Sequence, residues 1–226
     1  MTNKFMDETV DPHQPHPAGG QPTPQFIYFD LGNVLLQFDH DRAARQMAEV
    51  AGTTPERVWE IVFAGDLELR YERGEISTAD FHEVLCRQTG TTPPLAAILN
   101  AASDIFEPNP PVISLLGQLQ RNGHRLGLLS NTNDAHWSFI KTTFPDLLRA
   151  FDVIALSFEL NSLKPEPGIY AQAARLAGLD PAQILFVDDR PENVSSATEA
   201  RFDAIQFQGH RQLVADLVAR NLGPLM

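Results

Sequence analysis

The feature that most constrains this fold is a series of short apolar segments that alternate with helical stretches. The first, residues 26–29, places four large apolar residues in a row before Asp30. Such a run, with no polar alternation, is typical of a strand that is buried on both faces in a parallel sheet. Comparable segments follow at 126–130, 153–156, 184–188 and, more weakly, 204–207. The sequence therefore predicts a central parallel sheet.

Helical stretches separate most of these strands. Apolar residues recur at helical spacing across 111–122, and the segment ends at Asn122-Gly123, a common helix C-terminus. Residues 165–177 and 191–200 fill two further gaps. Strands and helices that alternate in this way favour an α/β fold, a doubly wound parallel sheet with a Rossmann-like core.

One connection is much longer than the others. About seventy residues lie between the first strand and the helix near Pro111, and they contain no strand-like run. An unstructured loop of this length is improbable in a compact domain. Helices are predicted here at residues 41–51, 55–63, 78–88 and 94–105. We therefore expect a small α-helical cap, residues 39–108, inserted into a catalytic core that residues 25–38 and 109–226 form.

Composition excludes several classes of partner. The net charge of −12 argues against binding to nucleic acid or to anionic membranes. No apolar run reaches the roughly eighteen residues of a membrane span, and the N-terminus has no apolar signal core. Residues 1–24, rich in Pro and Gly, are predicted to be a disordered tail. We expect a cytoplasmic protein, a monomer or a weak homodimer, and the lone Cys86 excludes an internal disulfide.

Three of the predicted strands end in a polar residue: Asp30, Ser130 and Asp188, the last followed by Asp189. In open α/β sheets, ligands bind beyond the carboxyl ends of the strands, so we expect these side chains to converge. The adjacent carboxylates of Asp188 and Asp189 repel each other unless a cation compensates. Their hard oxygen atoms suit Mg²⁺, although capping of the helix near Pro191 explains an aspartate here equally well.

Lys164 is unusual because only three of the 17 basic residues are lysines. It precedes Pro165 in a proline-stiffened loop at a predicted helix start. A compact ammonium here would neutralise a phosphate oxygen and hold an aspartate ionised. A solvated surface lysine is the alternative, and this residue alone favours it.

Taken in order, these features resemble the four motifs of the haloacid dehalogenase-like hydrolases. The matching segments are Phe29–Val34, Leu129–Asn133, Lys164-Pro165 and Val187–Asp189. Four ordered motifs on matching elements are far more specific than any one of them. The resemblance covers nearly all of residues 26–210, and the helical insertion is similar to the cap of the superfamily's small-helical-cap branch.

Within that branch, the chain resembles the bacterial glucose-1-phosphate phosphatases and the phosphatase domain of soluble epoxide hydrolases. Residues 30–34, residues 72–77 and the double aspartate carry this similarity. The resemblance implies a Mg²⁺-dependent hydrolase that removes phosphate from small phosphorylated metabolites.

The resemblance also implies roles for individual residues. Asp30 would be the nucleophile that forms an aspartyl-phosphate, which water then hydrolyses. Ser130 and the backbone of Asn131 would bind the phosphoryl oxygens, and Lys164 would balance the charge between Asp30 and the phosphate. Phosphoryl transfer needs mainly positioning and charge neutralisation, and this set supplies both.

A ligand set for Mg²⁺ follows from the same resemblance. The metal would lie among the carboxylates of Asp30 and Asp189 and the backbone carbonyl of Gly32. Asp188 would lie nearby and hold a metal-bound water or Lys164.

Gly32 departs from the family pattern. Most phosphatases of the superfamily carry a second aspartate at this position, two residues after the nucleophile, as general acid and base. Such help contributes about a hundred- to ten-thousand-fold to the rate. Another group substitutes for it, the substrate has an easy leaving group, or the activity is lost. We favour the first two together, with a sugar-1-phosphate as substrate, because an anomeric oxygen is more acidic than an ordinary alcohol.

Asp39, His40 and Asp41, where the chain enters the cap, are candidate substitutes for that acid. A polar loop in which Asp39 or Asp41 caps a helix is the alternative. His136 and Trp137 follow the Ser130 motif and are candidates to line the pocket, with a helix start and a packed aromatic ring as the alternative.

Three arginines of the cap are expected to meet a substrate or to pair with acidic neighbours. The arginines are Arg42, Arg70 and Arg73, and the neighbours are Glu68, Glu72 and Glu75. Cys86 lies in a helical pattern and is predicted to be a small core residue.

Two other functions remain open. A haloacid dehalogenase would use Asp30 on a carbon–halogen bond, but the double aspartate argues against it because that chemistry has no use for a metal. A non-catalytic module that binds a phosphorylated ligand would explain Gly32 as a sign of lost chemistry, but the joint presence of Asp30, Lys164 and Asp189 argues against decay.

Overall fold

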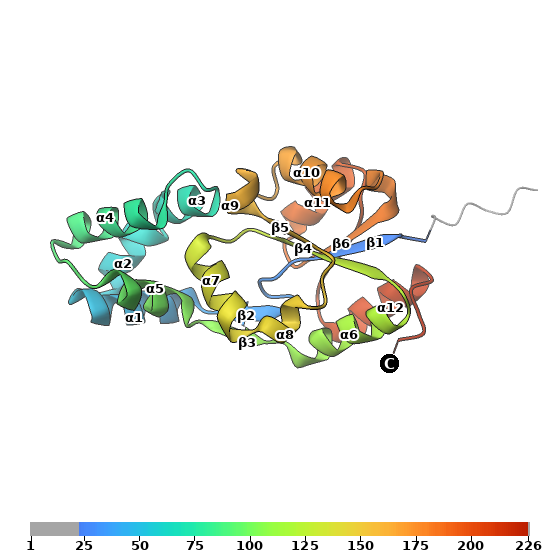
Figure 1. The fold of residues 1–226 in the computed structure, drawn as a ribbon, viewed down its shortest axis with the longest axis horizontal. Coiled ribbons are helices and arrows are strands. Elements are labelled where there is room, and N and C mark those ends of the chain that lie inside the picture. Colours follow the sequence, from blue (N-terminus) through green and yellow to red (C-terminus); the bar gives the residue numbers. More distant parts are fainter. Residues whose placement is uncertain (1–22, 226) are drawn as a thin grey trace, which may run out of the picture.

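The computed structural model describes residues 23–225. The predicted tail, residues 1–24, lies outside the described residues except for its last two. A sheet with helices on both faces forms one end of the molecule, and a helical insertion forms the other (Figure 1).

Five parallel strands form the central sheet. They are β1 (Phe26–Phe29), β4 (Arg125–Ser130), β5 (Val153–Leu156), β6 (Ile184–Asp188) and β7 (Asp203–Gln206). Their order in the sheet is β5-β4-β1-β6-β7, so β1 lies at the centre between β4 and β6. The sequence predictions for these five strands are confirmed.

Helices connect the strands of the sheet. They are α6 (Pro110–Arg121), α7 (Asp134–Thr143), α8 (Pro145–Leu148), α9 (Ser157–Leu160), α10 (Pro167–Ala177), α11 (Pro191–Glu199) and α12 (His210–Ala219), with a 3₁₀ turn η1 (Pro181–Gln183). The predicted helices at 111–122 and 191–200 agree to within a residue at each end. The helix predicted from residue 165 begins instead at Pro167.

Helices cover both faces of the sheet, as a doubly wound fold requires. Ile27 and Phe29 of β1 pack into a core cluster with α6 and α12, whereas Phe26 and Tyr28 pack with α10 and α11 on the opposite face. These two helix pairs lie below and above the sheet in Figure 1. All four residues are fully buried, which explains why the strand has no polar alternation.

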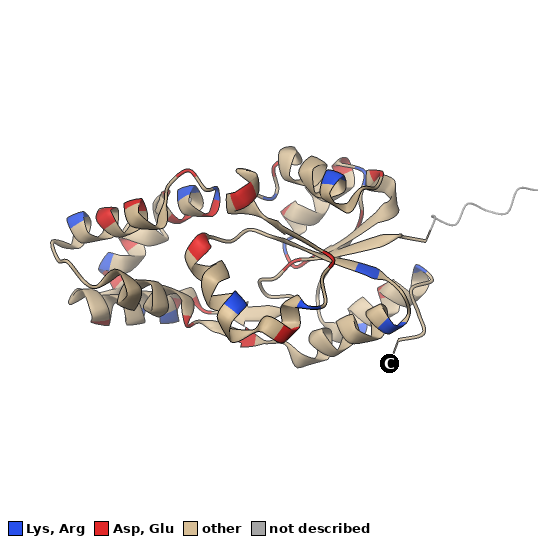
Figure 2. Ribbon diagram, in the orientation of Figure 1, with Lys and Arg blue, Asp and Glu red and all other residues tan. Residues whose placement is uncertain are grey.

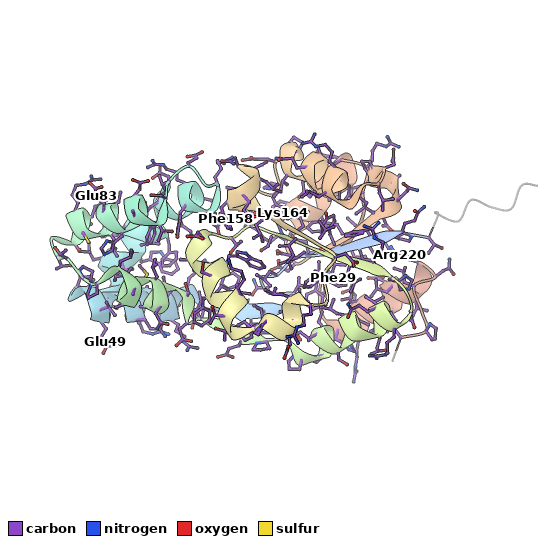
Figure 3. The ribbon with its side chains drawn as sticks, in the orientation of Figure 1. Phe29, Glu49, Glu83, Phe158, Lys164 and Arg220 are labelled. Carbon is purple, nitrogen blue, oxygen red and sulfur yellow. The ribbon has the colours of Figure 1, made fainter. Side chains whose placement is uncertain are left out.

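The insertion consists of five helices that surround a hydrophobic cluster, to which α7 of the core contributes Ala135. They are α1 (His40–Ala51), α2 (Pro55–Val62), α3 (Leu67–Glu72), α4 (Thr78–Thr89) and α5 (Leu95–Ser103). The structure thus contains the predicted helical cap, with α3 as an additional helix. The glutamates Glu49 and Glu83 lie on its outer surface (Figure 3).

Two short strands join the insertion to the core. β2 (Leu36–Phe38) and β3 (Phe106–Pro108) pair antiparallel, with Leu36 opposite Pro108. The prediction that this connection contains no strand is therefore wrong. Three-residue strands that include Gln37 and Glu107 give no apolar run, and each finds its partner some seventy residues away.

Basic and acidic residues are interspersed along the helices (Figure 2). Among the described residues, no helix combines the length and the apolar character needed to cross a bilayer.

Candidate active site

The carboxyl ends of three adjacent strands meet at one place in the structure. Asp30 follows β1, Ser130 ends β4 and Asp188 ends β6, and β1 pairs with both of the other strands. A pocket of about 420 Å³ opens beyond these ends, and residues of α3 form its opposite wall. The predicted convergence of these side chains is thus present in the fold.

Lys164 lies at the centre of this group. Its Nζ atom is 2.7 Å from Asp30 Oδ1 and 2.7 Å from Asp188 Oδ2, and it donates to the Leu129 carbonyl at 3.0 Å. Only 1% of its side chain is exposed. Burial alone would lower the pKa of Lys164, but the two carboxylates outweigh it and raise that pKa. The surface-lysine alternative is therefore wrong.

The Asp188 carboxylate is fully buried and engaged on both oxygens. Asn193 of α11 donates to Oδ1 and Oδ2 at 3.0 and 3.1 Å, and the Arg190 backbone N–H donates to Oδ1 at 2.9 Å. With Lys164 on Oδ2, four hydrogen bonds hold this side chain. Asp188 is therefore built to orient Lys164.

Asp30 is arranged differently. Its Oδ1 accepts from the Leu31 N–H at 2.7 Å and contacts Lys164, while its Oδ2 takes part in no hydrogen bond with the described residues. Burial raises the pKa of the Asp30 carboxyl, and Lys164 opposes that rise. One oxygen is thus held in place and the other is left for a ligand or an electrophile.

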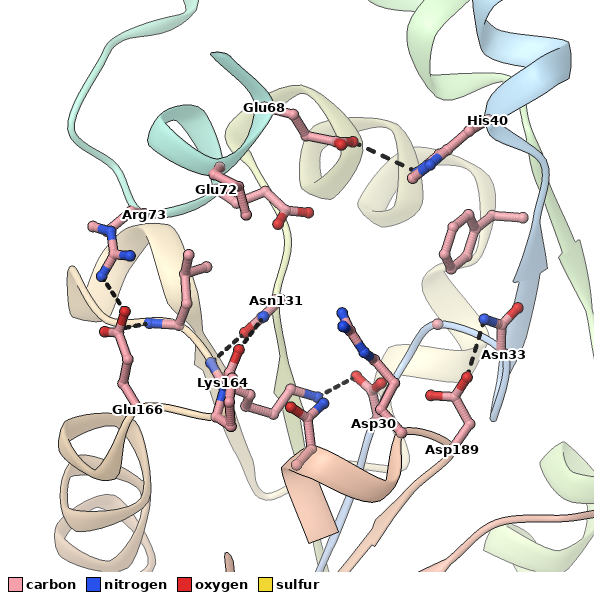
Figure 4. Close-up of a pocket in the computed structure, with 17 residues that line it drawn as sticks. Asp30, Asn33, His40, Glu68, Glu72, Arg73, Asn131, Lys164, Glu166 and Asp189 are labelled. Atoms are coloured by element: carbon pink, nitrogen blue, oxygen red, sulfur yellow. Dashed lines mark hydrogen bonds and ion pairs between the residues drawn. The ribbon is translucent and has the colours of Figure 1, made fainter. Parts of the chain in front are cut away.

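Three carboxylates form a site that fits a divalent cation. One oxygen each from Asp30, Asp188 and Asp189 lies within 4.8 Å of the others. Asn33 donates to Asp189 Oδ2 at 3.1 Å, which fixes the orientation of that carboxylate (Figure 4). Gly32 lines the same pocket. Hard oxygen donors that border an open pocket match the preference of Mg²⁺, which usually keeps several waters.

Ser130 and Asn131 lie on the β4 side of the site. Ser130 is 2% exposed and lines a recess of about 50 Å³ together with Gly32 and Asn131. The Asn131 side chain binds the Lys164 backbone, accepting from its N–H at 2.8 Å and donating to its carbonyl at 2.9 Å. The Asn131 amide therefore positions the lysine loop.

The α3 wall carries two carboxylates that the sequence reasoning missed as site residues. Glu68 and Glu72 line the pocket across from Asp30, and Glu68 lies 3.5 Å from His40 (Figure 4). Burial raises the pKa of Glu68 to about 8 and that of Glu72 to about 7. Their i,i+4 spacing, which places both on one helix face, was the available signal.

The expected pairing of the cap arginines is only partly correct. Arg70 lies near Glu75, and Arg73 pairs with Glu75 and, across the cap–core boundary, with Glu166. Glu68 and Glu72 take part in none of these pairs, because their face of α3 turns toward the pocket. Arg42, the third arginine, contacts Asp104 and Glu107.

Of the three candidate acids at the cap entrance, only His40 lines the pocket. Asp39 caps α1 by accepting from the Arg42 N–H at 3.0 Å, and Asp41 lies in the first turn of that helix. The capping alternative is thus correct for Asp39.

His136 and Trp137 take separate places. His136 lines the recess beside Ser130, and burial lowers its pKa to about 4. Trp137 is buried in the core cluster under the sheet. Cys86 is only partly buried, and its Sγ lies 3.4 Å from His82 Nε2.

Comparison with known proteins agrees with this geometry. The family model of the haloacid dehalogenase-like hydrolases matches residues 25–201, which include the ends of β1, β4 and β6. The chain belongs to the haloacid dehalogenase-like hydrolases. Its sequence is 24% identical over 186 residues to a D-ribitol-5-phosphate phosphatase of Bacteroides thetaiotaomicron, across 80% of this chain and 90% of the relative.

Solved structures of the family share the fold of this hydrolase. A haloacid dehalogenase-family enzyme of Bacteroides thetaiotaomicron, in complex with magnesium and inorganic phosphate, superposes with a TM-score of 0.74 at 26% identity, covering 84% of this chain and 98% of that one. The L-2-haloacid dehalogenase of Xanthobacter autotrophicus superposes with a TM-score of 0.59 at 21% identity, covering 89% and 85%, and shares the fold.

In this hydrolase an aromatic ring lies where a side chain at position 32 would be. A Cβ atom on Gly32 would lie 2.8 Å from Phe38 Cε1, closer than side-chain atoms pack. Phe38 ends β2, the strand that leads into the cap. A side chain at position 32 would therefore require the half-buried ring of Phe38 to move.

Proposed function

We propose that the chain is a Mg²⁺-dependent phosphomonoesterase that acts on small phosphorylated metabolites. The observation that carries the proposal is the buried ammonium of Lys164, 2.7 Å from both Asp30 and Asp188, beside a third carboxylate on Asp189. A single lysine among three acidic groups leaves a net negative site that a divalent cation and a phosphate dianion complete together. The relative named as a ribitol-5-phosphate phosphatase supports this reaction class.

In the proposed reaction Asp30 Oδ2 attacks phosphorus, and the bond between phosphorus and the ester oxygen breaks. Lys164 holds Asp30 ionised and neutralises a phosphoryl oxygen, while Ser130 and the Asn131 backbone bind the others. Water then cleaves the aspartyl-phosphate and releases inorganic phosphate. Asp188 keeps the lysine in position through both steps.

Mg²⁺ would be held by Asp30, Asp189 and the Gly32 carbonyl, with Asp188 adjacent. When bound, it would neutralise charge on the phosphoryl group and help to align it with Asp30. We assign Asn33 a supporting role, because its amide orients Asp189.

The substrate proposal rests on the wall that faces the phosphate site. Glu68, Glu72 and His40 offer hydrogen-bonding groups to hydroxyls, and Arg73 is already paired with Glu166 and Glu75. We propose that the substrates are phosphate esters of uncharged sugars or polyols. Sugar-1-phosphates are favoured because an anomeric oxygen leaves more readily than an ordinary alkoxide. In this scheme residues 39–108 act as the substrate-selecting cap of a core formed by 25–38 and 109–226.

A direct assay tests the proposal. Purified protein is given p-nitrophenyl phosphate with Mg²⁺ and with EDTA, and Asp30→Asn is the matched control. We expect release that requires Mg²⁺ and is lost in the variant. Equal release by wild type and Asp30→Asn would indicate a contaminant and favour a non-catalytic binding module. Haloacid turnover that persists in EDTA would favour a dehalogenase.

A second comparison tests the substrate. Glucose-1-phosphate and glucose-6-phosphate carry the same sugar and differ in the acidity of the leaving oxygen. We expect a higher kcat/KM for the 1-phosphate, and a clear preference for the 6-phosphate would contradict the proposal.

A further inference from the structure

Glu72 differs from the other carboxylates that line the pocket. Asp30 and Asp189 are hydrogen-bonded within the proposed metal site, Glu68 contacts His40, and Glu166 is held by Arg73. Within residues 23–225, the Glu72 carboxylate accepts no hydrogen bond and forms no ion pair. It points from α3 into the space above Asp30 and Lys164 (Figure 4).

The core fixes the position of Glu72. Its backbone carbonyl lies 2.6 Å from Ser157 Oγ, which also accepts from the Thr132 N–H at 3.0 Å, next to the phosphate-binding end of β4. Two residues further on, Gly74 has a φ of 73° and packs so closely on Phe158 that a Cβ would collide with its carbonyl oxygen. The C-terminal end of α3 is thus docked onto the core.

Glu72 also borders the place where a carboxyl is missing. It lines both the main pocket and the recess that Gly32 and Ser130 share. The ring of Phe38 fills the direction in which a side chain at position 32 would extend. The Glu72 carboxyl therefore borders the same recess from the α3 side.

We propose that Glu72 is the proton donor for the leaving oxygen and replaces the acid that position 32 lacks. This inference rests on the proposed phosphatase function. As the bond between phosphorus and the ester oxygen breaks, its electron pair goes to that oxygen, and the Glu72 carboxyl supplies the proton that yields the alcohol. In the second half-reaction the Glu72 carboxylate takes a proton from the attacking water while the bond between Asp30 and phosphorus breaks.

The electrostatic surroundings agree with this role. Burial raises the pKa of Glu72 to about 7, although Lys164 and Arg190 lower it, so the group exchanges a proton near neutral pH. Glu68, one turn earlier on the same helix, faces Glu72 and has its own pKa raised by burial and by that neighbour. His40, which contacts Glu68, has a pKa lowered by burial.

The test compares two esters of similar size, p-nitrophenyl phosphate and benzyl phosphate. The first has a leaving group that needs no proton, whereas the second would leave as a strongly basic alkoxide unless an acid protonates it as the bond breaks. We expect Glu72→Gln to lower kcat/KM for benzyl phosphate by about a hundred- to ten-thousand-fold, and for p-nitrophenyl phosphate by less than about fivefold. Glu68→Gln, on the same helix and wall, is the matched control and should affect both esters alike.

A second variant, Glu72→Ala, tests whether the lost activity comes from the missing carboxyl and not from a rearrangement of the pocket. In Glu72→Ala, added formate should restore benzyl phosphate hydrolysis, because a small acid can occupy the vacated space. Equal losses on the two esters in Glu72→Gln, no loss at all, or a wild type that cleaves p-nitrophenyl but not benzyl phosphate would overturn the role of Glu72. A wild type that cleaves neither ester would instead refute the phosphatase function itself.

Discussion

Replacing Lys164 by Met removes the buried charge that two carboxylates share. Each contact of 2.7 Å corresponds to an attraction of about 6 kcal/mol at an effective dielectric constant of about 20, before the cost of desolvation. Without the ammonium, Asp30 and Asp188 face each other with oxygens up to 4.8 Å apart, a repulsion of about 3 kcal/mol on the same scale.

We therefore expect Lys164→Met to lower the free energy of unfolding by about 3–5 kcal/mol, the range measured when one partner of a buried pair is removed. For a chain of this size that corresponds to a fall in Tm of about 6–20 °C. Thermal unfolding at pH 7.5 in EDTA measures it, and Lys141→Met, at an exposed lysine of α7, is the control.

Two measurements distinguish the loss of the Lys164 charge from a loss of packing as the cause of the lower stability. The folded-state pKa of Asp30 is raised above its unfolded value, so the folded protein binds more protons and the deficit should shrink as the pH falls toward 4. Asp188→Asn in the Lys164→Met background should restore part of the stability. A variant within about 2 °C of the wild-type Tm would refute the reasoning.

Two further predictions concern residues around the site. Asn33→Gly removes the amide that orients Asp189, and glycine readily adopts the φ of 55° found at this position. The Mg²⁺ concentration for half-maximal activity should therefore rise by about 10- to 100-fold. Hydrolysis of p-nitrophenyl phosphate at increasing Mg²⁺ concentrations measures it. Burial lowers the pKa of His136 from its ordinary value of 6.5 to about 4 in the folded protein. Between these values the unfolded chain binds more protons, so stability falls as the pH drops through that window. His136→Gln should flatten this part of the stability profile in urea unfolding, and an unchanged slope would contradict the assignment.

The sheet was predictable because its strands are buried on both faces. Residues 26–29, 153–156 and 184–187 are apolar throughout, and a short run of this kind is typical of a buried parallel strand. The cap helices were predictable from their apolar spacing for a similar reason: their hydrophobic faces meet one another. Both patterns are local in the sequence, and the structure contains the strands and helices that they predict.

What the sequence did not reveal depends on docking between distant segments. β2 and β3 are three residues long and pair across the whole cap, so neither is recognisable alone. α3 is a six-residue helix rich in charge, which reads as a surface segment. Its contact with Ser157 and Phe158 turns Glu68 and Glu72 toward the pocket, and only the folded structure brings those groups opposite Asp30.

The central claim is that Asp30 accepts the phosphoryl group at this site. Rapid acid quenching of the enzyme during turnover of p-nitrophenyl phosphate with Mg²⁺, followed by peptide mass spectrometry, tests it directly. The account predicts one phosphoryl group on the peptide that contains Asp30 and none in Asp30→Asn. Sustained Mg²⁺-dependent turnover in the Asp30→Asn variant, or a phosphoryl group found on a different residue, would contradict it.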